Sequence, residues 1–228
     1  MARKERVNPI KYGITLVPEQ KKTKELILAN EIVIVTGNPG SGKSSVVAQT
    51  VLDLLFSRSV SEIILTRPTI EVGKSLGLLP GEKEDKLAPY LKAFIKSLHK
   101  CYPHREKLEK ELKEGKIYTE ALQFIRGENI EQHQIIICDE AQNTTKEEME
   151  ALLTRAAGGK IVVLGDLRQK DIKVESGLGF ALDLQRAIPE IKHVHLVENH
   201  RSGVVKKIID YIYGEEEYYP INAEKKEM

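Results

Sequence analysis

The sequence contains no tryptophan, only four phenylalanines and two cysteines, and its charges almost cancel. With 35 Lys and Arg residues against 34 Asp and Glu residues, the formal net charge is +1 at pH 7. A nearly neutral chain is not a polycation that coats nucleic acid through its net charge. Binding through a local basic surface is still compatible with this composition, because net charge does not say where the charges lie.

The two cysteines, Cys101 and Cys138, are far apart in the sequence. This spacing argues against a disulfide framework and against a structural zinc site, and it fits a reducing compartment. No apolar run approaches the ~20 residues that cross a bilayer. The charged residues 1–6 are not followed by an apolar stretch, so no secretory signal is expected. We therefore expect a cytoplasmic protein without a membrane partner.

The residues that are abundant predict an α/β domain. Hydrophobic residues make up 41% and charged residues 30% of the 228 positions, as in globular proteins with one core plus insertions or tails. Helical patterns cover residues 44–55 and 146–157. Short apolar runs rich in β-branched residues predict buried strands at residues 31–35, 62–65, 134–138, 160–164 and, more weakly, 193–197. Strands that alternate with helices indicate a parallel sheet covered on both faces.

Residues 82–116 interrupt this alternation and predict a helical insertion at the edge of the core. The segment has ten Lys and Arg residues against seven Asp and Glu residues, a charge of about +3. Pro103 should end a first helix, and residues 107–113 restart a second. The first helix carries an apolar stripe and a parallel basic stripe, formed by Leu91, Ile95 and Leu98 and by Lys92, Lys96 and Lys100. The basic stripe is either a solvated face or a surface that binds a nucleic-acid strand.

A complete phosphate-loop motif, G-x-x-x-x-G-K-S, lies between the first predicted strand and the first predicted helix. It consists of Gly37, Asn38, Pro39, Gly40, Ser41, Gly42, Lys43 and Ser44. The glycines allow successive N–H groups of the loop, continued by Ser45, to converge on phosphate oxygens at the start of the helix. Lys43 should reach the β- and γ-phosphates, and the Ser44 hydroxyl should bind Mg²⁺. The sequence therefore predicts a site for ATP and Mg²⁺.

Two acidic residues, Asp139 and Glu140, directly follow the strand predicted at residues 134–138. The carboxyl end of a strand in such a sheet faces the crevice where ligands bind. We expect Asp139 to hold Mg²⁺ and Glu140 to accept a proton from the attacking water. A second carboxylate at this place favours hydrolysis over phosphate transfer to another substrate.

The strand predicted at residues 160–164 ends in Gly165-Asp166-Leu167-Arg168-Gln169. The amide of Gln169, placed at the tip of this strand, can hydrogen-bond the γ-phosphate or orient water. An exposed glutamine in a turn is the alternative.

The three motifs together resemble those of superfamily 1 helicases, and two longer stretches are similar to the PhoH family of ATPases. These stretches are residues 66–81 and residues 139–145, and residues 176–178 also fit. The resemblance implies a single RecA-like core with a further strand between the phosphate-loop strand and the Asp-Glu strand. It also implies ATP hydrolysis coupled to single-stranded or structured RNA or DNA, often in a homo-oligomeric ring and typically a hexamer. We expect an N-terminal segment, an ATPase domain and a C-terminal tail at residues 1–15, 16–213 and 214–228.

The resemblance assigns roles to four further residues. Gln20 is similar to the glutamine that reads the adenine edge, and Arg67 and Lys74 lie in the motif that follows the nucleic-acid strand. Arg201 resembles an arginine that contacts the γ-phosphate and stabilises the charge of phosphoryl transfer. Exposed polar residues, internal ion pairs and a structural arginine are the alternatives. His200 departs from the family pattern, which often reads Val-Arg-His-Pro here, so a histidine role is in doubt.

Other candidate residues have weaker signals. Cys138 lies in an apolar strand and is expected in the core. His193 and His195 alternate on a strand, without further support for a metal site. Arg126 and Arg155 could line the nucleotide or a subunit interface.

Two other functions are compatible with the same loop. In a small-molecule kinase, the insertion at residues 82–116 would be a mobile lid. In a non-enzymatic module, ATP binding would only gate assembly or nucleic-acid binding. Because the chain has room for one core, whereas monomeric helicases of this superfamily pair two, we expect subunits to complete one another's ATP sites. Arg201 would then act in its own or in a neighbouring subunit.

Overall fold

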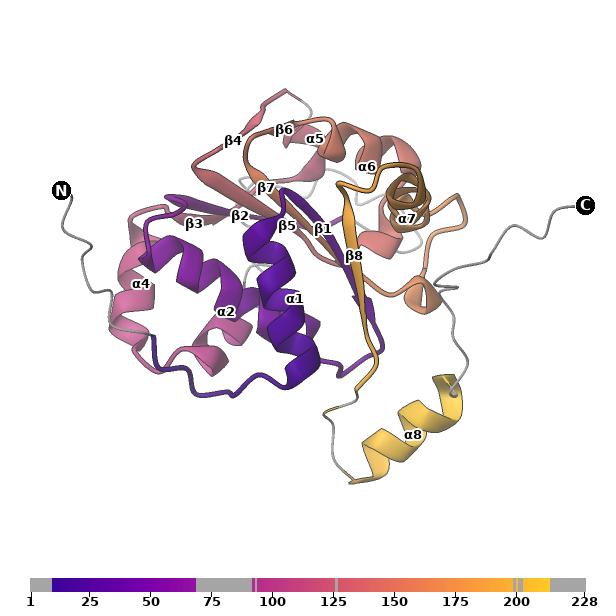
Figure 1. Ribbon diagram of the computed structural model, residues 1–228, viewed down its shortest axis with the longest axis horizontal. Coiled ribbons are helices and arrows are strands. Elements are labelled where there is room, and N and C mark those ends of the chain that lie inside the picture. Colours follow the sequence, from indigo (N-terminus) through magenta and orange to yellow (C-terminus); the bar gives the residue numbers. More distant parts are fainter. Residues whose placement is uncertain are drawn as a thin grey trace, which may run out of the picture.

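The computed structural model describes residues 10–68, 92, 94–125, 127–198, 200 and 203–213. Its centre is a six-stranded sheet in the order β3-β2-β5-β7-β1-β8, in which every neighbouring pair is parallel (Figure 1). The strands are β1 (Ile32–Gly37), β2 (Glu62–Thr66), β3 (Ile117–Thr119), β5 (Gln134–Cys138), β7 (Lys160–Gly165) and β8 (Lys192–Leu196). The α/β fold and the parallel sheet expected from the sequence are thus confirmed.

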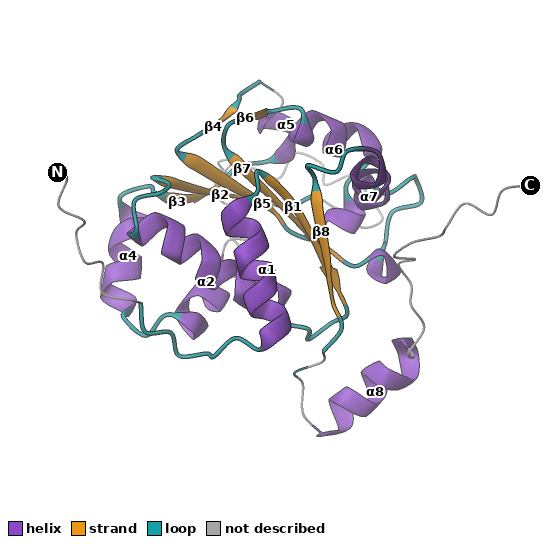
Figure 2. Cartoon of the chain, in the orientation of Figure 1, coloured by secondary structure: helices purple, strands orange, loops and turns teal. Residues whose placement is uncertain are grey.

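Helices cover both faces of the sheet, as Figure 2 shows. One layer contains α1 (Pro18–Ala29), α2 (Lys43–Phe56), a helix at residues 94–101 and α4 (Arg105–Lys113). The other layer contains α5 (Leu122–Ile125), α6 (Lys146–Leu153) and α7 (Gly177–Ala187). Successive strand residues point to opposite faces, so Val33 and Val35 pack in the first layer and Ile34 in the second. This double burial explains why the strands are continuous apolar runs.

The last described helix, α8 (Gly203–Tyr213), lies apart from both helical layers (Figure 1). Of its side chains, Ile209 is buried, whereas an apolar set is exposed: Val204, Val205, Ile208, Tyr211 and Ile212. Among the described helices, none is both long and apolar enough to cross a membrane.

The described part of the predicted insertion is the connection between β2 and β3. Parallel neighbours cannot be joined by a tight turn, so the chain must cross over one face of the sheet. The helix at residues 94–101 and α4 make this crossover, and Leu98 and Leu108 are fully buried in the first layer. The lysines at positions 92, 96 and 100 are all exposed, and residues 82–91 and 93 lie outside the described residues.

The predicted end of the helix at residues 146–157 is wrong. Helix α6 stops at Leu153, and residues 156–157 form β6 (Ala156–Ala157), which pairs with β4 (Ile130–Glu131) in a separate two-stranded sheet. A side chain at position 159 would put its Cβ 2.4 Å from the Glu131 carbonyl oxygen, so this close approach needs Gly159. Tertiary pairing therefore overrides the local helical pattern. Strand β3 was not predicted, because three residues are too few for a periodic signal.

Candidate nucleotide site

The order of the strands brings the sequence motifs to one edge of the sheet. Strand β1 leads into the phosphate loop, β5 leads into the acidic pair, and β7, which leads into the Gln169 segment, lies between them. Because all three strands are parallel, their carboxyl ends meet at the same edge. The further strand between the phosphate loop and the acidic pair, implied by the resemblance, is present.

The phosphate loop has the backbone conformation that its glycines allow. Gly40 and Gly42 both have φ of 87°, in the left-handed region that other residues avoid. Gly42 is the N-cap of α2 and provides no side-chain cap, so the first N–H groups of the helix face the loop. A Cβ at position 42 would lie 2.3 Å from Nε2 of Gln20, so a larger residue would also displace the Gln20 amide. The loop is therefore arranged as an anion cradle.

Lys43 curls back over this loop. Its Nζ donates to the carbonyl oxygens of Gly37 at 2.5 Å and of Asn38 at 3.3 Å. The ammonium group is thereby held at the loop, where a phosphate oxygen could replace a carbonyl as its partner.

Gln20 is 4% exposed and packs against the phosphate loop. Its Nε2 donates to the Ser41 carbonyl oxygen at 3.1 Å, and its Oε1 accepts from the backbone N–H of Val17 at 3.2 Å. The same side chain lines a cleft of about 530 Å³ between the start of α1, the loop and His200. This volume suits a drug-sized ligand. The structure thus places Gln20 beside a cleft that joins the phosphate loop.

At Asp139, the first residue of the acidic pair, the backbone still pairs with strand β2. The backbone N–H of Asp139 donates to the Thr66 carbonyl oxygen of β2 at 3.0 Å. Burial, and then the negative charge of Glu140, raise the pKa of the Asp139 carboxyl, whereas Arg67 and Lys43 act in the opposite direction. A carboxylate whose ionised form is disfavoured by burial is stabilised by a bound cation.

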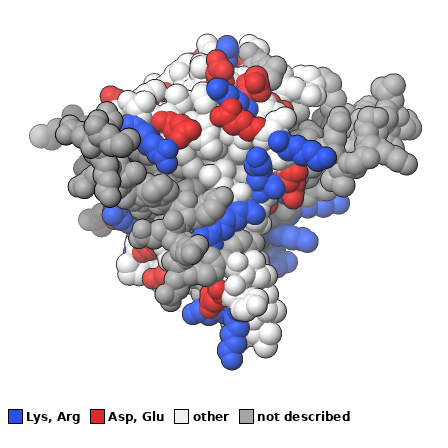
Figure 3. Space-filling model, turned by 90° about the vertical axis from the view of Figure 1, so that its right-hand side faces the viewer, with Lys and Arg blue, Asp and Glu red and all other residues white. Residues whose placement is uncertain are grey.

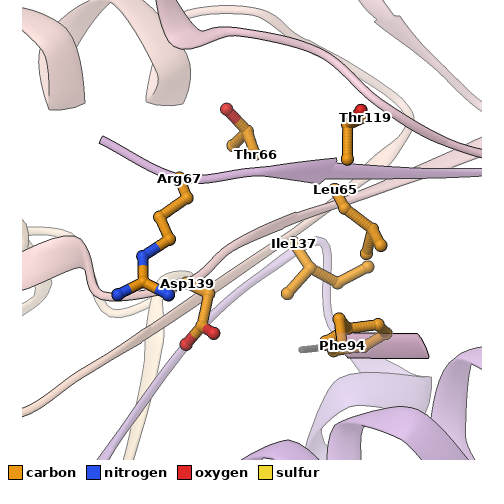
Figure 4. A pocket seen from close by; sticks show the side chains of 7 residues that line it. All are labelled: Leu65, Thr66, Arg67, Phe94, Thr119, Ile137 and Asp139. Atoms are coloured by element: carbon orange, nitrogen blue, oxygen red, sulfur yellow. The ribbon is translucent and has the colours of Figure 1, made fainter. Parts of the chain in front are cut away.

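The oxygen groups near Asp139 fit Mg²⁺. Figure 4 shows a small cavity at the ends of β2 and β5, with a volume of about 20 Å³, which can hold one water molecule. The buried Thr66 hydroxyl at the end of β2 has no hydrogen-bond partner among the described residues, but Figure 4 shows that it points to the other side of the strand from Asp139. Carboxylate and hydroxyl oxygens, here Asp139 and the Ser44 side chain at the start of α2, suit Mg²⁺, which keeps several waters and needs few protein ligands. In the described part of the chain no three acidic, His or Cys residues cluster as a full metal cage.

Glu140 is held from two sides. Its Oε2 accepts from Nε2 of Gln142 at 2.6 Å, and its Oε1 lies 3.5 Å from Nη2 of Arg67. Glu140 has φ of 53°, and such a strained conformation in a non-glycine residue is typical of functional sites. Gln142 is itself 1% exposed, and its Oε1 accepts from the Asp166 N–H of the β7 tip at 3.1 Å. No role for Gln142 follows from the sequence alone, although it belongs to the Asp-Glu-Ala-Gln motif.

We expect Gln142→Leu to lower turnover without abolishing ATP binding. Leucine fills the space but leaves Oε2 of Glu140 without its donor and the Asp166 N–H without an acceptor, a loss of about 1–3 kcal/mol of stability. A mispositioned catalytic group costs up to about 10²-fold in rate. Steady-state ATP hydrolysis and urea unfolding check both effects, with exposed Gln132→Leu as the control. Unchanged kcat would contradict the positioning role.

The Gln169 amide is bound to its own turn. Its Nε2 donates to Oδ2 of Asp166 at 2.8 Å, while Oδ1 of Asp166 accepts from the Arg168 N–H at 3.0 Å and caps the 3-10 turn η2 (Leu167–Gln169). The Gln169 carbonyl oxygen also accepts a long bond, 3.4 Å, from Gln142. Gln169 thus belongs to the network around Glu140 through its backbone.

Thr36, at the end of β1, joins the two histidines of β8. Its fully buried Oγ1 lies 2.8 Å from Nε2 of His193 and 2.8 Å from Nδ1 of His195. Burial lowers the pKa of both imidazoles, and that of His193 falls to about 4. No role for Thr36 follows from the sequence alone; in the structure it connects the phosphate-loop strand to the edge strand.

We expect the free energy of unfolding to fall below neutral pH because of His193. Its pKa is about 4 in the folded protein against 6.5 unfolded, so the unfolded chain binds more protons between these values. Stability is therefore complete above pH 6.5 and is lost as the pH falls towards 4. Urea unfolding across this range should show a free energy of unfolding that rises with pH. His193→Gln should reduce this slope by up to the equivalent of about one bound proton. The exposed His133→Gln should keep the slope; an equal loss there would contradict the assignment.

The remaining candidates divide into two groups. Lys74, Arg126 and Arg201 lie outside the described residues. Arg155 precedes β6 at the amino ends of the strands, the opposite edge of the sheet from the phosphate loop, so it does not line the nucleotide site of its own chain. Cys138 is fully buried in the core, as predicted.

Comparison with known proteins identifies relatives of this chain. The sequence profile of the PhoH-like protein family matches residues 14–213. A PhoH-like protein of Mycobacterium leprae is 35% identical over 224 residues, which is 95% of this chain and 63% of the relative. A PhoH-like protein of Bacillus subtilis is 35% identical over 188 residues, 79% of this chain and 58% of the relative. The chain thus spans about three fifths of these relatives.

Among solved structures, the Pif1 helicase from Candida albicans is similar in fold. The TM-score is 0.50 at 18% sequence identity, and the match covers 88% of this chain and 43% of the helicase. The likeness is one of fold. This chain therefore belongs to the PhoH family and has a RecA-like P-loop NTPase core.

Proposed function

We propose that the chain is an Mg²⁺-dependent ATPase that couples hydrolysis to binding or remodelling RNA or DNA in the cytoplasm. One observation carries the proposal: the Asp139-Glu140 pair lies at the same sheet edge as the phosphate loop, and Glu140 is oriented by the buried Gln142. A loop that binds phosphates and a carboxylate fixed nearby are what in-line attack of water requires.

In this proposal the residues of the site divide the work. The backbone N–H groups of the phosphate loop and Lys43 bind the phosphates, and Glu140 orients water and accepts its proton. Mg²⁺, bound through Ser44 and Asp139, would neutralise charge on the phosphate oxygens. Arg201 would add positive charge; the backbone N–H of His200, its neighbour in sequence, donates to the Gly40 carbonyl oxygen at 3.0 Å. Gln20 would contact the adenine in the adjoining cleft.

Nucleic-acid binding rests on local positive charge, since the net charge is close to zero. On the face in Figure 3, acidic and basic side chains are interspersed at the top, whereas basic side chains predominate in the middle and on the right. Arg67 and Lys74 are the proposed contacts, and the exposed lysines at positions 92, 96 and 100 form a second candidate strip. Such contacts are salt-dependent.

We also propose a homo-oligomer, with a hexameric ring favoured, in which one chain completes the ATP site of the next. The exposed apolar side of α8 supports this part, because contiguous apolar patches mark protein contacts. Arg201 is the residue that would act within one subunit or across the boundary.

The test is an ATPase assay with Mg²⁺ or with a chelator, with and without single-stranded RNA and DNA, alongside light scattering and strand displacement. The proposal expects hydrolysis that needs Mg²⁺ and rises with nucleic acid. A non-enzymatic module would bind ATP without turnover. A small-molecule kinase, with residues 82–116 as its lid, would transfer phosphate to an added acceptor and ignore nucleic acid. A strict monomer with full stimulated activity would contradict the shared site.

A further inference from the structure

Arg67, a proposed nucleic-acid contact, is paired with the proposed catalytic base. Its Nη2 lies 3.5 Å from Oε1 of Glu140. The sheet register creates this proximity, because Thr66 of β2 pairs with Cys138 of β5, and the residues that follow leave the sheet side by side. Figure 4 shows the Arg67 side chain extending from the end of β2 to lie beside Asp139. The ion pair therefore connects the proposed nucleic-acid contact at the end of β2 with the proposed catalytic base at the end of β5.

We infer that Arg67 restrains Glu140 until nucleic acid takes over the guanidinium, so that binding of a strand releases the base for hydrolysis. This inference rests on the proposed function and adds its regulation. The phosphate backbone is the chemistry that competes with Glu140, because guanidinium groups bind phosphates through paired hydrogen bonds.

The two contacts of Glu140 differ in a way that suits different roles. Gln142 is almost fully buried, neutral and bonded at 2.6 Å, so it is a permanent support. Arg67 is charged, and it contacts Oε1, the other oxygen of the same carboxylate. Gln142 therefore orients Glu140, whereas Arg67 competes with water for Oε1.

The Arg67 contact is also easy to exchange. At 3.5 Å it is longer than the 2.7–2.9 Å of a strong charge-assisted bond. The two side chains are 28% and 35% exposed, so an incoming phosphate has access to the pair. Partly exposed pairs of this kind shift an equilibrium by no more than about fivefold. The release of Glu140 should thus account for up to about a fivefold stimulation.

A binding experiment without nucleotide tests the competition directly. If Glu140 and nucleic acid share Arg67, then Glu140→Gln should tighten binding of a labelled single-stranded oligonucleotide severalfold, measured by anisotropy for both RNA and DNA. The gain should vanish in the Arg67→Ala background, which makes a double-mutant cycle. Glu150→Gln removes an exposed carboxylate from α6 and should leave affinity unchanged. A gain of equal size with and without Arg67 would overturn the inference.

Hydrolysis gives the second readout. Arg67→Ala should raise ATPase activity without nucleic acid by up to about fivefold and remove an equal part of the stimulation. Arg67→Gln, which keeps more of the side chain, should behave alike, and Arg186→Ala should have no effect because Arg186 pairs with Asp183 on α7. If the basal activity of Arg67→Ala stays constant or falls, the inference is overturned. The proposed function still stands in that case, provided that nucleic acid stimulates the wild type. A wild type without hydrolysis or nucleic-acid binding would overturn both.

Discussion

Glu140→Gln should bind ATP and hydrolyse it about 10²–10⁴-fold more slowly than the wild type, the contribution expected of a general base. Glutamine is nearly isosteric and still offers Gln142 an amide oxygen to bond, so the network to Asp166 survives. The loss then reflects the missing proton acceptor. Steady-state hydrolysis measures the rate, and stabilisation of the variant by ATP with Mg²⁺ in thermal unfolding reports binding separately.

The matched control for this prediction is Glu150→Gln, which makes the same chemical change on the exposed side of α6. It should leave both rate and binding as they are. Turnover of Glu140→Gln at the wild-type rate would show that another group accepts the proton, and the assignment of the base would fall.

The sequence predicted those parts of the site that depend on local chemistry. A loop of three glycines between a strand and a helix can fold in few ways, so Gly40 and Gly42 have the left-handed conformations that the motif requires. The Asp-Glu pair could also be placed, because a parallel sheet aligns the carboxyl ends of its strands. The crossing of the β2–β3 connection and the end of α6 depended on long-range contacts and were not predicted.

The contacts between motifs could not be derived from the sequence, because they depend on strand register. Gln142 bridges Glu140 of the β5 segment and Asp166 of the β7 segment. Thr36 meets two histidines more than 150 positions away. Each of these residues is ordinary in its local sequence, and only the order of strands in the sheet gives it a partner.

The second large effect is expected from Lys43→Ala, which should weaken ATP binding by about 10–10²-fold, the loss of a charged hydrogen-bond donor. Turnover should also fall, because Lys43 stabilises the negative charge that develops during phosphoryl transfer. In the structure Nζ of Lys43 donates to the carbonyl oxygens of Gly37 and Asn38, which belong to its own loop and are partly buried. Its removal should therefore change the stability of the nucleotide-free protein little.

Because Lys43→Ala should change ATP binding but not the stability of the nucleotide-free protein, thermal unfolding with and without ATP tests the role of Lys43. A ligand at about 100 times its dissociation constant stabilises a protein by about 2.7 kcal/mol, and a 10²-fold loss of affinity reduces this to about 0.4 kcal/mol. Lys43→Ala should thus unfold like the wild type without ATP and gain almost nothing from added ATP and Mg²⁺. Exposed Lys22→Ala on α1 should keep the full gain. If Lys43→Ala keeps it too, phosphate binding depends on the backbone of the loop, and Lys43 contributes little to the bound ground state.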